Sequence, residues 1–444
     1  MLACVIGAAL VYLSGDLFTQ SMSLDGIVYA GLSLNLANEH AGVWMIPHFD
    51  AAAGFFYDHP PLGIWLQSLW FQILGESFWV ERLYCMVVLA LICALLLVAW
   101  RRINEGSLDG AAWVLTLFLL MPVVTRTAKN NLLELPLTLV TMAAVIFAWE
   151  SRRRTLASPL VGVLVAIGIL IKGPVALFPL AAPLVFAVIV DRQFRHGIYR
   201  STLATLTCSA VIGGLMLSEP AREAIGSYLH QQLFASLAGE RPAVHDRLYL
   251  ANHIAINLLP AVLLTVFVTI KQGRGVFSSK AMAWLSIGLI ASLPLLISPR
   301  QFRHYLFPSL PYFALAAAMI ARPRIYLNAR WAQIGAALLL ITALIRGTLT
   351  FAEPGKDATV LRALSEVATV AEEQGQRLVG FCTPEPMRQA YLLRYHGLRT
   401  DTRNPPALPF AVCPSQPDAS FTRVLGLTEG FSLWVQHPGQ TPPS

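Results

Sequence analysis

Long apolar runs constrain this chain more than any other feature of its sequence. Of the 444 residues, 56% are hydrophobic and 13% are charged, whereas an average soluble domain carries roughly 25% charged residues. Many of the hydrophobic residues lie in segments long enough to cross the roughly 30 Å apolar layer of a bilayer as helices. This pattern excludes a soluble enzyme, a disordered chain and a nucleic-acid-binding module. It predicts an α-helical polytopic membrane protein.

The apolar runs predict about eleven membrane-spanning helices. Lys172 is the only charged residue in the stretch 158–190. As one helix this stretch would be about 50 Å long, too long for a single crossing, and Lys172-Gly173-Pro174 is a natural break. We therefore expect two spans joined by a tight turn. The predicted spans are residues 2–19, 80–100, 111–126, 132–149, 156–171, 173–190, 201–219, 251–270, 281–298, 304–321 and 331–349.

Basic residues predict the orientation. The chain has 24 basic and 16 acidic residues before residue 350, but 8 basic and 9 acidic residues after residue 349. Loops rich in Arg and Lys alternate with other loops, and such basic loops face the cytoplasm. We therefore expect a multi-pass protein of the bacterial inner (plasma) membrane, with a cytoplasmic N-terminus and an uncleaved first span. The basic loops contain Arg101–Arg102, Arg152–Arg154, and the arginines and lysines of residues 192–200, 271–280 and 322–330.

Two periplasmic segments follow from this orientation. The first loop, residues 20–79, is too apolar to be free in water, and residues 26–37 and 62–74 are predicted to be amphipathic helices in the membrane interface, apolar face down. The tail is expected to form a small periplasmic α/β domain over residues 350–444, separate from the membrane domain 1–349. Its predicted helices are 356–374 and 384–396, and its predicted strands are 377–382, 409–413 and 431–435.

The cysteines give one open question. Cys382 and Cys413 both lie in the tail. They can form a disulfide if the tail is periplasmic, but spacing alone does not show that they are close.

Two acidic residues fall on the predicted outer side. Asp25 follows the first span, where it either caps the next helix or acts as a general base on an acceptor hydroxyl at the membrane surface. Glu134 enters an apolar span. An acidic residue there usually faces the protein interior or a cavity and has a partner, although the preference of acidic residues for helix N-termini is an alternative explanation.

Several cations fall on the same side, against the positive-inside trend. Lys172 lies alone between two apolar spans, where it either extends to the membrane surface or meets an anion such as a lipid phosphate. His59 precedes the predicted helix 62–74 and is either a solvated loop residue or a hydrogen-bond donor to a phosphate or carboxylate. A reaction between a lipid-linked anion and a polar outer substrate needs such an arrangement. The other cations are Arg126, Lys129, Arg300 and Arg303.

Five segments carry a family resemblance. They resemble, in order, an acidic first-loop motif, the (H/K)-P-P-L-G motif, an A-R-x-x-x-L-D-x-P-L segment, an L-x-K-G-P turn and an R/K-x-x-Y-x-x-P-x-x-P segment. The chain thereby resembles the GT-C class of polyprenyl-phosphate-sugar glycosyltransferases, and is similar to the lipid A aminoarabinose transferase, protein O-mannosyltransferases and Rgt-type lipopolysaccharide-core transferases. The segments are Asp25–Ala30, Tyr57–Leu66, Arg126–Leu137, Leu170–Leu177 and Arg303–Pro311.

The resemblance implies a reaction. A sugar is transferred from a polyprenyl-phosphate donor to an envelope acceptor (lipid A, core glycan, another glycolipid or protein) on the periplasmic face. Asp25 takes the proton from the acceptor hydroxyl, and a single displacement inverts the anomeric centre. Glu134 is the second catalytic residue. The donor phosphate is expected to bind Lys172, Arg300, Arg303 and His59, and the substrates to be oriented by Tyr29, Asp58, Arg126, Lys129 and Tyr305.

The expected partners are the lipid-linked sugar, the acceptor and membrane lipid, but no nucleic acid. No cofactor is required by this chemistry, and no metal-ligand spacing is present, although Asp25, Asp58 and His59 leave a divalent cation possible. Gly26 occupies the position at which the family has a second acidic residue. Gly26 leaves open the interpretation of an inactive relative that only binds lipid. A polytopic transporter of an anionic or lipid-linked solute also stays open, because it too would have about eleven spans and charges within the membrane. A transporter would place its charges at mid-bilayer in broken helices.

Overall fold

The computed structural model describes residues 19–39, 42–240, 242–246, 248–272, 277–321, 355–405, 408–427 and 430–436, with isolated positions between 337 and 349. The chain divides into two compact units. Unit 1 comprises residues 1–17, 58–63 and 85–351, and unit 2 comprises residues 18–57, 64–84 and 352–444. The predicted spans 2–19 and 331–349 lie almost wholly outside the described residues.

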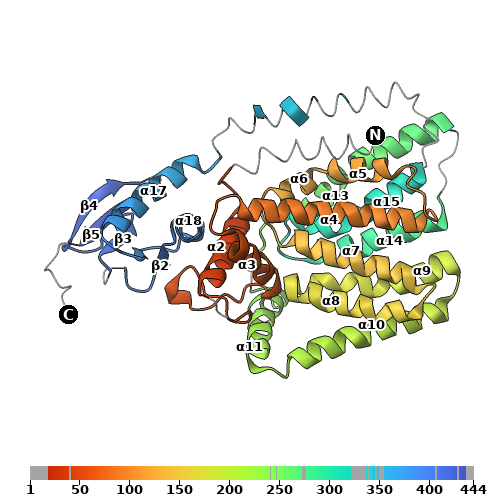
Figure 1. The fold of residues 1–444 in the computed structure, drawn as a ribbon, viewed down its shortest axis with the longest axis horizontal. Coiled ribbons are helices and arrows are strands. Elements are labelled where there is room, and N and C mark those ends of the chain that lie inside the picture. Colours follow the sequence, from red (N-terminus) through yellow and green to blue (C-terminus); the bar gives the residue numbers. More distant parts are fainter. Residues whose placement is uncertain are drawn as a thin grey trace. The chain divides into compact units, whose positions relative to one another are not determined.

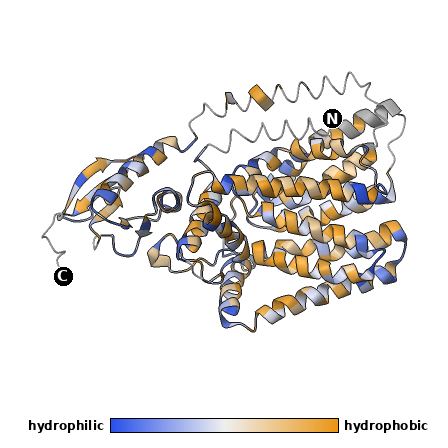
Figure 2. Cartoon of the chain, in the orientation of Figure 1, coloured by the Kyte–Doolittle hydropathy of each residue, from blue (hydrophilic) through white to orange (hydrophobic). Residues whose placement is uncertain are grey.

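Unit 1 is helical (Figure 1), and its helices are hydrophobic along most of their length (Figure 2). α7 packs on α8, α8 on α10, and α14 on α15. The helices are α4 (Val80–Ile103, whose first residues belong to unit 2), α5 (Ala111–Leu119), α6 (Pro122–Ala128), α7 (Glu134–Ser151), α8 (Ser158–Lys172), α9 (Ala182–Phe186), α10 (Phe194–Leu215), α11 (Glu219–Tyr228), α12 (Ala235–Leu237), α13 (Tyr249–Gln272), α14 (Ser279–Ser292) and α15 (Leu310–Ala321). Shorter helical turns join several of them, including Gly173–Ala181, Leu229–Phe234 and Arg303–Ser309.

Four helical runs among the described residues are long and apolar enough to cross a membrane, or up to six if each of two bent pairs is one span. The expected straight span 111–126 is one of these pairs, because the chain bends by 72° between α5 and α6, where Pro122 begins the second helix. The other pair is α10 with the run from Glu219 to Phe234, bent by 114°. The continuous runs are Val80–Ile103, Glu134–Ser151, Thr155–Asp191 and Ser279–Ile297.

The 37-residue run Thr155–Asp191 reverses direction at its middle. Gly173 has a φ of +81°, which ends α8. A Cβ on Gly168 would lie 2.8 Å from the Cβ of Ala176, whereas residues eight apart in a straight helix are about 12 Å apart. The chain therefore forms two segments joined by a tight turn at Lys172-Gly173, as the sequence predicts.

Unit 2 joins the first loop to the tail. α2 (Leu24–Glu39) packs on α18 (Pro386–His396), and Ser33 Oγ donates to the carbonyl of Ile64 in α3 (Leu62–Leu74). Residues 26–37 of α2 are all buried. The expected helix 26–37 therefore forms, but its surroundings differ from an interface helix with one apolar face down, because all of its faces are buried and α18 packs on it.

The tail forms the expected α/β fold. Five strands lie in the order β2-β1-β3-β5-β4, with β1 parallel to β2 and β3, and β5 antiparallel to β3 and β4. α17 (Ala358–Glu373) buries Leu364, Val367, Ala368 and Ala371, the spacing of one helix face. The strands are β1 (Leu378–Phe381), β2 (Arg399–Asp401), β3 (Phe410–Cys413), β4 (Phe421–Gly426) and β5 (Ser432–Gln436); β2 and β4 were not expected.

Cys382 and Cys413 form a disulfide, with their Cα atoms 5.1 Å apart. Cys382 follows β1, and Cys413 ends β3. Because β1 and β3 are neighbours in the sheet, the pairing left open by the sequence is decided by the strand order. The compact units divide after residue 351, close to the expected boundary at residue 350, but most of loop 20–79, expected in the membrane domain, belongs with the tail.

Candidate active site

A buried ion pair lies at the centre of the candidate site in unit 1. Glu134 is the first residue of α7 and is 1% exposed. Its Oε1 accepts a hydrogen bond from Lys172 Nζ at 2.5 Å and lies 3.6 Å from His304 Nε2. Its Oε2 is buried and has no hydrogen-bond partner among the described residues. A buried polar atom without a partner is rare and costly, so this oxygen is available to a ligand.

Close packing brings three of the family-like segments together at this pair. Gly63 ends the His59-Pro60-Pro61-Leu62-Gly63 motif. Its neighbours leave no room for a side chain at this position. An added Cβ would lie 2.6 Å from Leu133 Cδ2 and 3.5 Å from the carbonyl oxygen of Ile171. These neighbours directly precede Glu134 and Lys172 in the sequence. Gly63 therefore allows the first loop to pack closely against the residues that precede both members of the ion pair.

The turn after Lys172 is held by a tyrosine. Gly173 has positive φ, and an added Cβ would lie 2.0 Å from the hydroxyl oxygen of Tyr228. That hydroxyl donates a hydrogen bond to the carbonyl of Lys172 over 3.4 Å. Tyr228 is the last residue of α11 and is 8% exposed. The Lys172 side chain, in turn, lies 5.2 Å from the ring centre of Tyr305.

The first-loop motif is tied to the segment after α11. Gln232 Nε2 donates to Asp58 Oδ1 over 2.7 Å, and the rings of His59 and Tyr228 are 6.5 Å apart. The segment 219–234 thus contacts both the motif residues and the Lys172 turn.

Three arginines in unit 1 add positive charge without a carboxylate partner. Arg126 and Arg303 lie close enough to repel each other, with Tyr249 near Arg126. The Nε atom of Arg300 is buried without a hydrogen-bond partner. Among the residues that the structure describes, none of the three forms an ion pair. An excess of cations of this kind favours binding of an anion.

A row of rings extends from α13 to the ion pair. His253 lies 4.5 Å from Tyr249, and Tyr249 stacks on His245 at 3.9 Å between ring centres. The row continues through Phe302 to His304 and Tyr305, with steps of 5.7, 5.4 and 4.9 Å. Because it ends beside Glu134 and Lys172, it provides an aromatic surface next to the charged groups.

Unit 1 holds nine of the eleven residues proposed from the sequence. They are Asp58, His59, Arg126, Lys129, Glu134, Lys172, Arg300, Arg303 and Tyr305. The direct contacts join Glu134 to Lys172, and Lys172 to Tyr305. Asp25 and Tyr29 belong to unit 2. Asp25 lies in the first turn of α2, and Tyr29 is 3% exposed.

Several residues of the site were not found from the sequence. Tyr228, Gln232, Tyr249 and His253 come from the segment after α10 and the start of α13, which no motif marks. The signal was the polar and aromatic content of an outer loop, which alone does not select individual residues. Within the described part of the chain, no group of three or more His, Cys, Asp or Glu side chains could hold a metal ion.

Comparisons with known proteins agree with the motifs. Residues 58–216 match the family described as dolichyl-phosphate-mannose-protein mannosyltransferase. The crystal structure of ArnT from Cupriavidus metallidurans in the apo state matches with 15% sequence identity and a TM-score of 0.69, over 98% of this chain and 97% of that one. The ArnT structure bound to undecaprenyl phosphate matches with 15% identity and a TM-score of 0.70, over 100% and 99%.

A more distant match has the same general fold. The archaeal oligosaccharyltransferase AglB from Archaeoglobus fulgidus, in complex with an inhibitory peptide and a dolichol-phosphate, has 12% identity and a TM-score of 0.54, over 93% of this chain and 69% of that one. The family match and the shared fold confirm the resemblance predicted from the five motifs, and the chain has the fold of the GT-C superfamily of glycosyltransferases.

Proposed function

We propose that this protein is a membrane glycosyltransferase that uses a polyprenyl-phosphate-linked sugar. The observation that carries the proposal is the Glu134–Lys172 pair in the same unit as three arginines that form no ion pair among the described residues. ArnT, which shares the fold, has been seen with bound undecaprenyl phosphate. A lipid phosphate supplies the anion that these cations lack.

The donor phosphate would bind the cations of unit 1. Lys172, Arg300 and Arg303 are its proposed ligands, with His59 as a hydrogen-bond donor, and Arg126 lies close enough to Arg303 to share the same anion. As the bond from the anomeric carbon to the phosphate oxygen breaks, the bonding electrons pass to the phosphate. Cations already in place stabilise this developing charge. One such contact typically lowers the barrier by about 3 kcal/mol.

Glu134 would fix Lys172 and orient the sugar. Its Oε1 holds the ammonium group at 2.5 Å, and its unpartnered Oε2 can accept a hydrogen bond from a sugar hydroxyl. The rings of Tyr305 and Tyr249 offer faces on which the apolar side of a sugar can stack. Asp58 and Lys129 would orient the substrates, as would Tyr29 of unit 2.

Asp25 is the proposed general base, because it lies in the acidic first-loop motif. Asp25 takes the proton of the acceptor hydroxyl while the acceptor oxygen forms its bond to the anomeric carbon. The products are the glycosylated acceptor and a polyprenyl phosphate, with the anomeric configuration inverted. We propose that the acceptor is an envelope glycolipid or protein, and that the reaction needs no cofactor.

The proposed location is the periplasmic face of the inner membrane. The Cys382–Cys413 disulfide supports it, because disulfides persist in oxidising compartments. The basic loops between the spans support a cytoplasmic N-terminus.

The test compares envelope glycolipids and glycoproteins by mass spectrometry in a deletion strain carrying the wild-type gene, Asp25→Asn or Lys172→Met. We expect the wild-type gene to restore a sugar that both variants leave missing at normal protein levels. Near-normal transfer with Asp25→Asn would exclude Asp25 as the base. Unchanged glycans together with lost solute uptake in the deletion strain would instead identify a transporter.

A further inference from the structure

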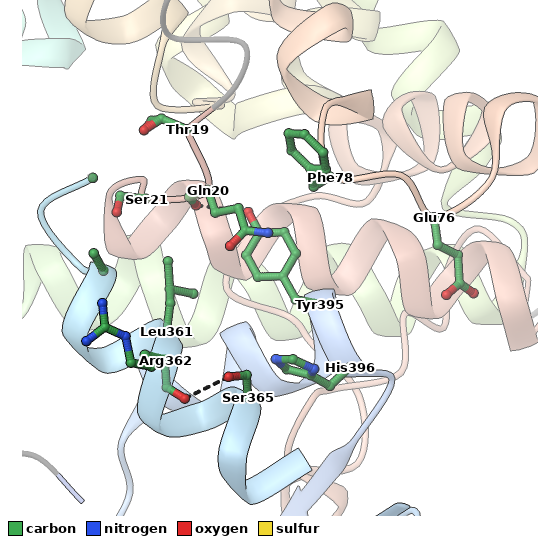
Figure 3. A pocket seen from close by; sticks show the side chains of 12 residues that line it. Thr19, Gln20, Ser21, Glu76, Phe78, Leu361, Arg362, Ser365, Tyr395 and His396 are labelled. Carbon is green, nitrogen blue, oxygen red and sulfur yellow. Dashed lines mark hydrogen bonds between the residues drawn. The ribbon is translucent and has the colours of Figure 1, made fainter. Parts of the chain in front are cut away.

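A second cavity lies wholly within unit 2, outside the candidate active site. It has a volume of about 650 Å³, within the range of sites that bind small molecules. One wall is formed by residues 19–21 and the segment between α3 and α4, and the other by α17 and the end of α18. Figure 3 shows the side chains of Tyr395 and His396 beside those of Gln20 and Ser365 in this cavity.

The cavity lies next to segments that the sequence predicts to enter the membrane. Thr19, in its wall, ends the predicted first span, and Gly355, also in its wall, lies just after the predicted last span. Two large apolar side chains are exposed in this region: Phe78, in the cavity wall, is 37% exposed, and Ile73, near the end of α3 and outside the cavity lining, is 80% exposed. Exposed apolar and aromatic residues at such a position are typical of a membrane–water interface.

The cavity carries one charge of each sign. Arg362 and Glu76 lie on opposite sides of it (Figure 3). Glu76 accepts a hydrogen bond from the amide of Asn38 over 2.7 Å, and neither it nor Arg362 has an ion-pair partner among the residues that the structure describes. Burial lowers the pKa of His396 below its usual value, which leaves this side chain neutral at pH 7. Phe78 lies on the same wall as Glu76 and can stack on a cation.

We propose that this cavity binds the headgroup of a zwitterionic membrane lipid, with the lipid phosphate at Arg362 and a primary amine at Glu76. The amide of Gln20, which lines the cavity, can donate a hydrogen bond to a phosphate oxygen, whereas the hydroxyl of Ser365 already donates to the carbonyl of Arg362 over 2.7 Å. A headgroup with hydroxyls in place of the amine would also satisfy Arg362, but it has no ammonium group to pair with the Glu76 carboxylate, and the hydrogen bonds of its neutral hydroxyls are weaker. The site is separate from the Glu134–Lys172 pair and does not depend on the proposed sugar transfer.

The test measures lipid retention by native mass spectrometry on the full-length, delipidated protein. Phosphatidylethanolamine and phosphatidylglycerol with identical acyl chains are the probes. We expect phosphatidylethanolamine to bind more tightly than phosphatidylglycerol. Arg362→Gln should weaken phosphatidylethanolamine binding about tenfold or more, since a charged hydrogen bond is lost. Glu76→Gln should remove the preference for phosphatidylethanolamine without weakening the binding of phosphatidylglycerol.

The matched control is Arg423→Gln, because Arg423 is an exposed arginine on β4 that does not line the cavity. It makes the same change in charge and should leave the binding of both lipids unchanged. Equal losses with Arg362→Gln and Arg423→Gln would overturn the proposal, because the effect would then come from overall charge. Equal or tighter binding of phosphatidylglycerol by the wild-type protein would overturn it as well.

Discussion

Each unit contains an ion pair between a buried glutamate and a basic residue, and the two pairs differ in their hydrogen-bond partners. In unit 2, Oε2 of Glu81 accepts a hydrogen bond from Arg394 at 2.6 Å, and Oε1 lies 3.5 Å from the hydroxyl of Tyr395, which also donates to the carbonyl of Gln20 over 2.9 Å. In unit 1, Glu134 is bonded through one oxygen and its other oxygen has no hydrogen-bond partner among the described residues.

The basic residues differ in what they contact, although Arg394 Nε, like Glu134 Oε2, is buried without a hydrogen-bond partner among the described residues. Arg394 also donates to the carbonyls of Glu76 and Ser77, so it joins the tail to the start of α4. Lys172 contacts Glu134 and the ring of Tyr305, and three arginines of the same unit form no ion pair among the described residues. Burial of an ion pair therefore does not by itself indicate function. A complete pair holds a fold together, whereas an incomplete pair with surplus cations can bind a ligand.

The largest effect is expected at the complete pair. Arg394→Met should destabilise unit 2 by about 3–5 kcal/mol, because it leaves the Glu81 carboxylate buried without its cation. The measurement is the resistance of unit 2 to a protease in the full-length protein, with Arg423→Gln as the exposed-arginine control. Adding Glu81→Gln to Arg394→Met should recover part of the lost stability. Protease resistance equal to that of the wild type in Arg394→Met would show that the pair does not stabilise unit 2.

The incomplete pair should respond differently. Lys172→Met should lower sugar transfer by about 10²–10³-fold, the typical effect of one stabilising contact to the leaving group. The double variant Glu134→Gln, Lys172→Met no longer has an unpaired buried carboxylate, so its protease resistance should recover while its transfer does not. Recovery of transfer in the double variant would contradict a role of Lys172 in the reaction and reduce the pair to a structural one.

A smaller effect tests how Lys172 is placed. Tyr228→Phe keeps the ring over Gly173 but removes the hydroxyl that donates to the Lys172 carbonyl. A neutral hydrogen bond of this kind contributes about 0.5–1.5 kcal/mol, so undecaprenyl phosphate should bind about threefold to tenfold more weakly to the purified protein. The control is Tyr199→Phe, since Tyr199 lies on α10 and is 61% exposed. Equal affinities of the two variants would show that the hydroxyl does not position Lys172.

The smallest effect concerns pH and unit 2. Burial lowers the pKa of His396 from its usual value, and the negative charge of Glu372 opposes this shift only in part. The fold therefore favours the neutral ring. Burial of the neutral ring therefore contributes to the free energy of unfolding of unit 2 above the ordinary histidine pKa of about 6.5. This contribution is lost as the pH falls through the lowered pKa of His396. The protease resistance of unit 2 should thus fall more between pH 7 and pH 5 in the wild type than in His396→Gln. The same decline in both proteins would assign it to other groups.

Much of the architecture could be predicted from the sequence because its signals are local. Apolar runs marked the helices, and the predicted helix 62–74 matches α3 (Leu62–Leu74). The two helices and three strands expected in the tail are all present, whereas the short strands β2 and β4 lacked a clear alternating pattern. The turn at Lys172-Gly173 was also predictable, because a single charge followed by Gly and Pro interrupts an otherwise apolar run.

The candidate site was only partly predictable. Lys172 was identified as a cation on the wrong side for the positive-inside rule, and Glu134 as an acidic residue at the start of an apolar helix. Their contact joins residues 38 positions apart and depends on how α7 packs on α8. Tyr228 carries no charge and belongs to no motif, so only its position over Gly173 reveals it. Likewise, the fully buried surroundings of α2 come from the tail that packs on it, more than 300 residues later in the chain.

The sequence by itself determined that this chain crosses a membrane, where it turns, and which superfamily motifs it carries, because hydrophobicity and turn propensity act over a few residues. Only the tertiary structure decided which charges meet and which stay without a partner. That decision depends on the packing of distant segments, since burial and the distance between charged atoms set the strength of an ion pair. Glu81 and Glu134 are both single acidic residues at the start of an apolar helix. Their environments alone make one a structural contact and the other the centre of a proposed active site.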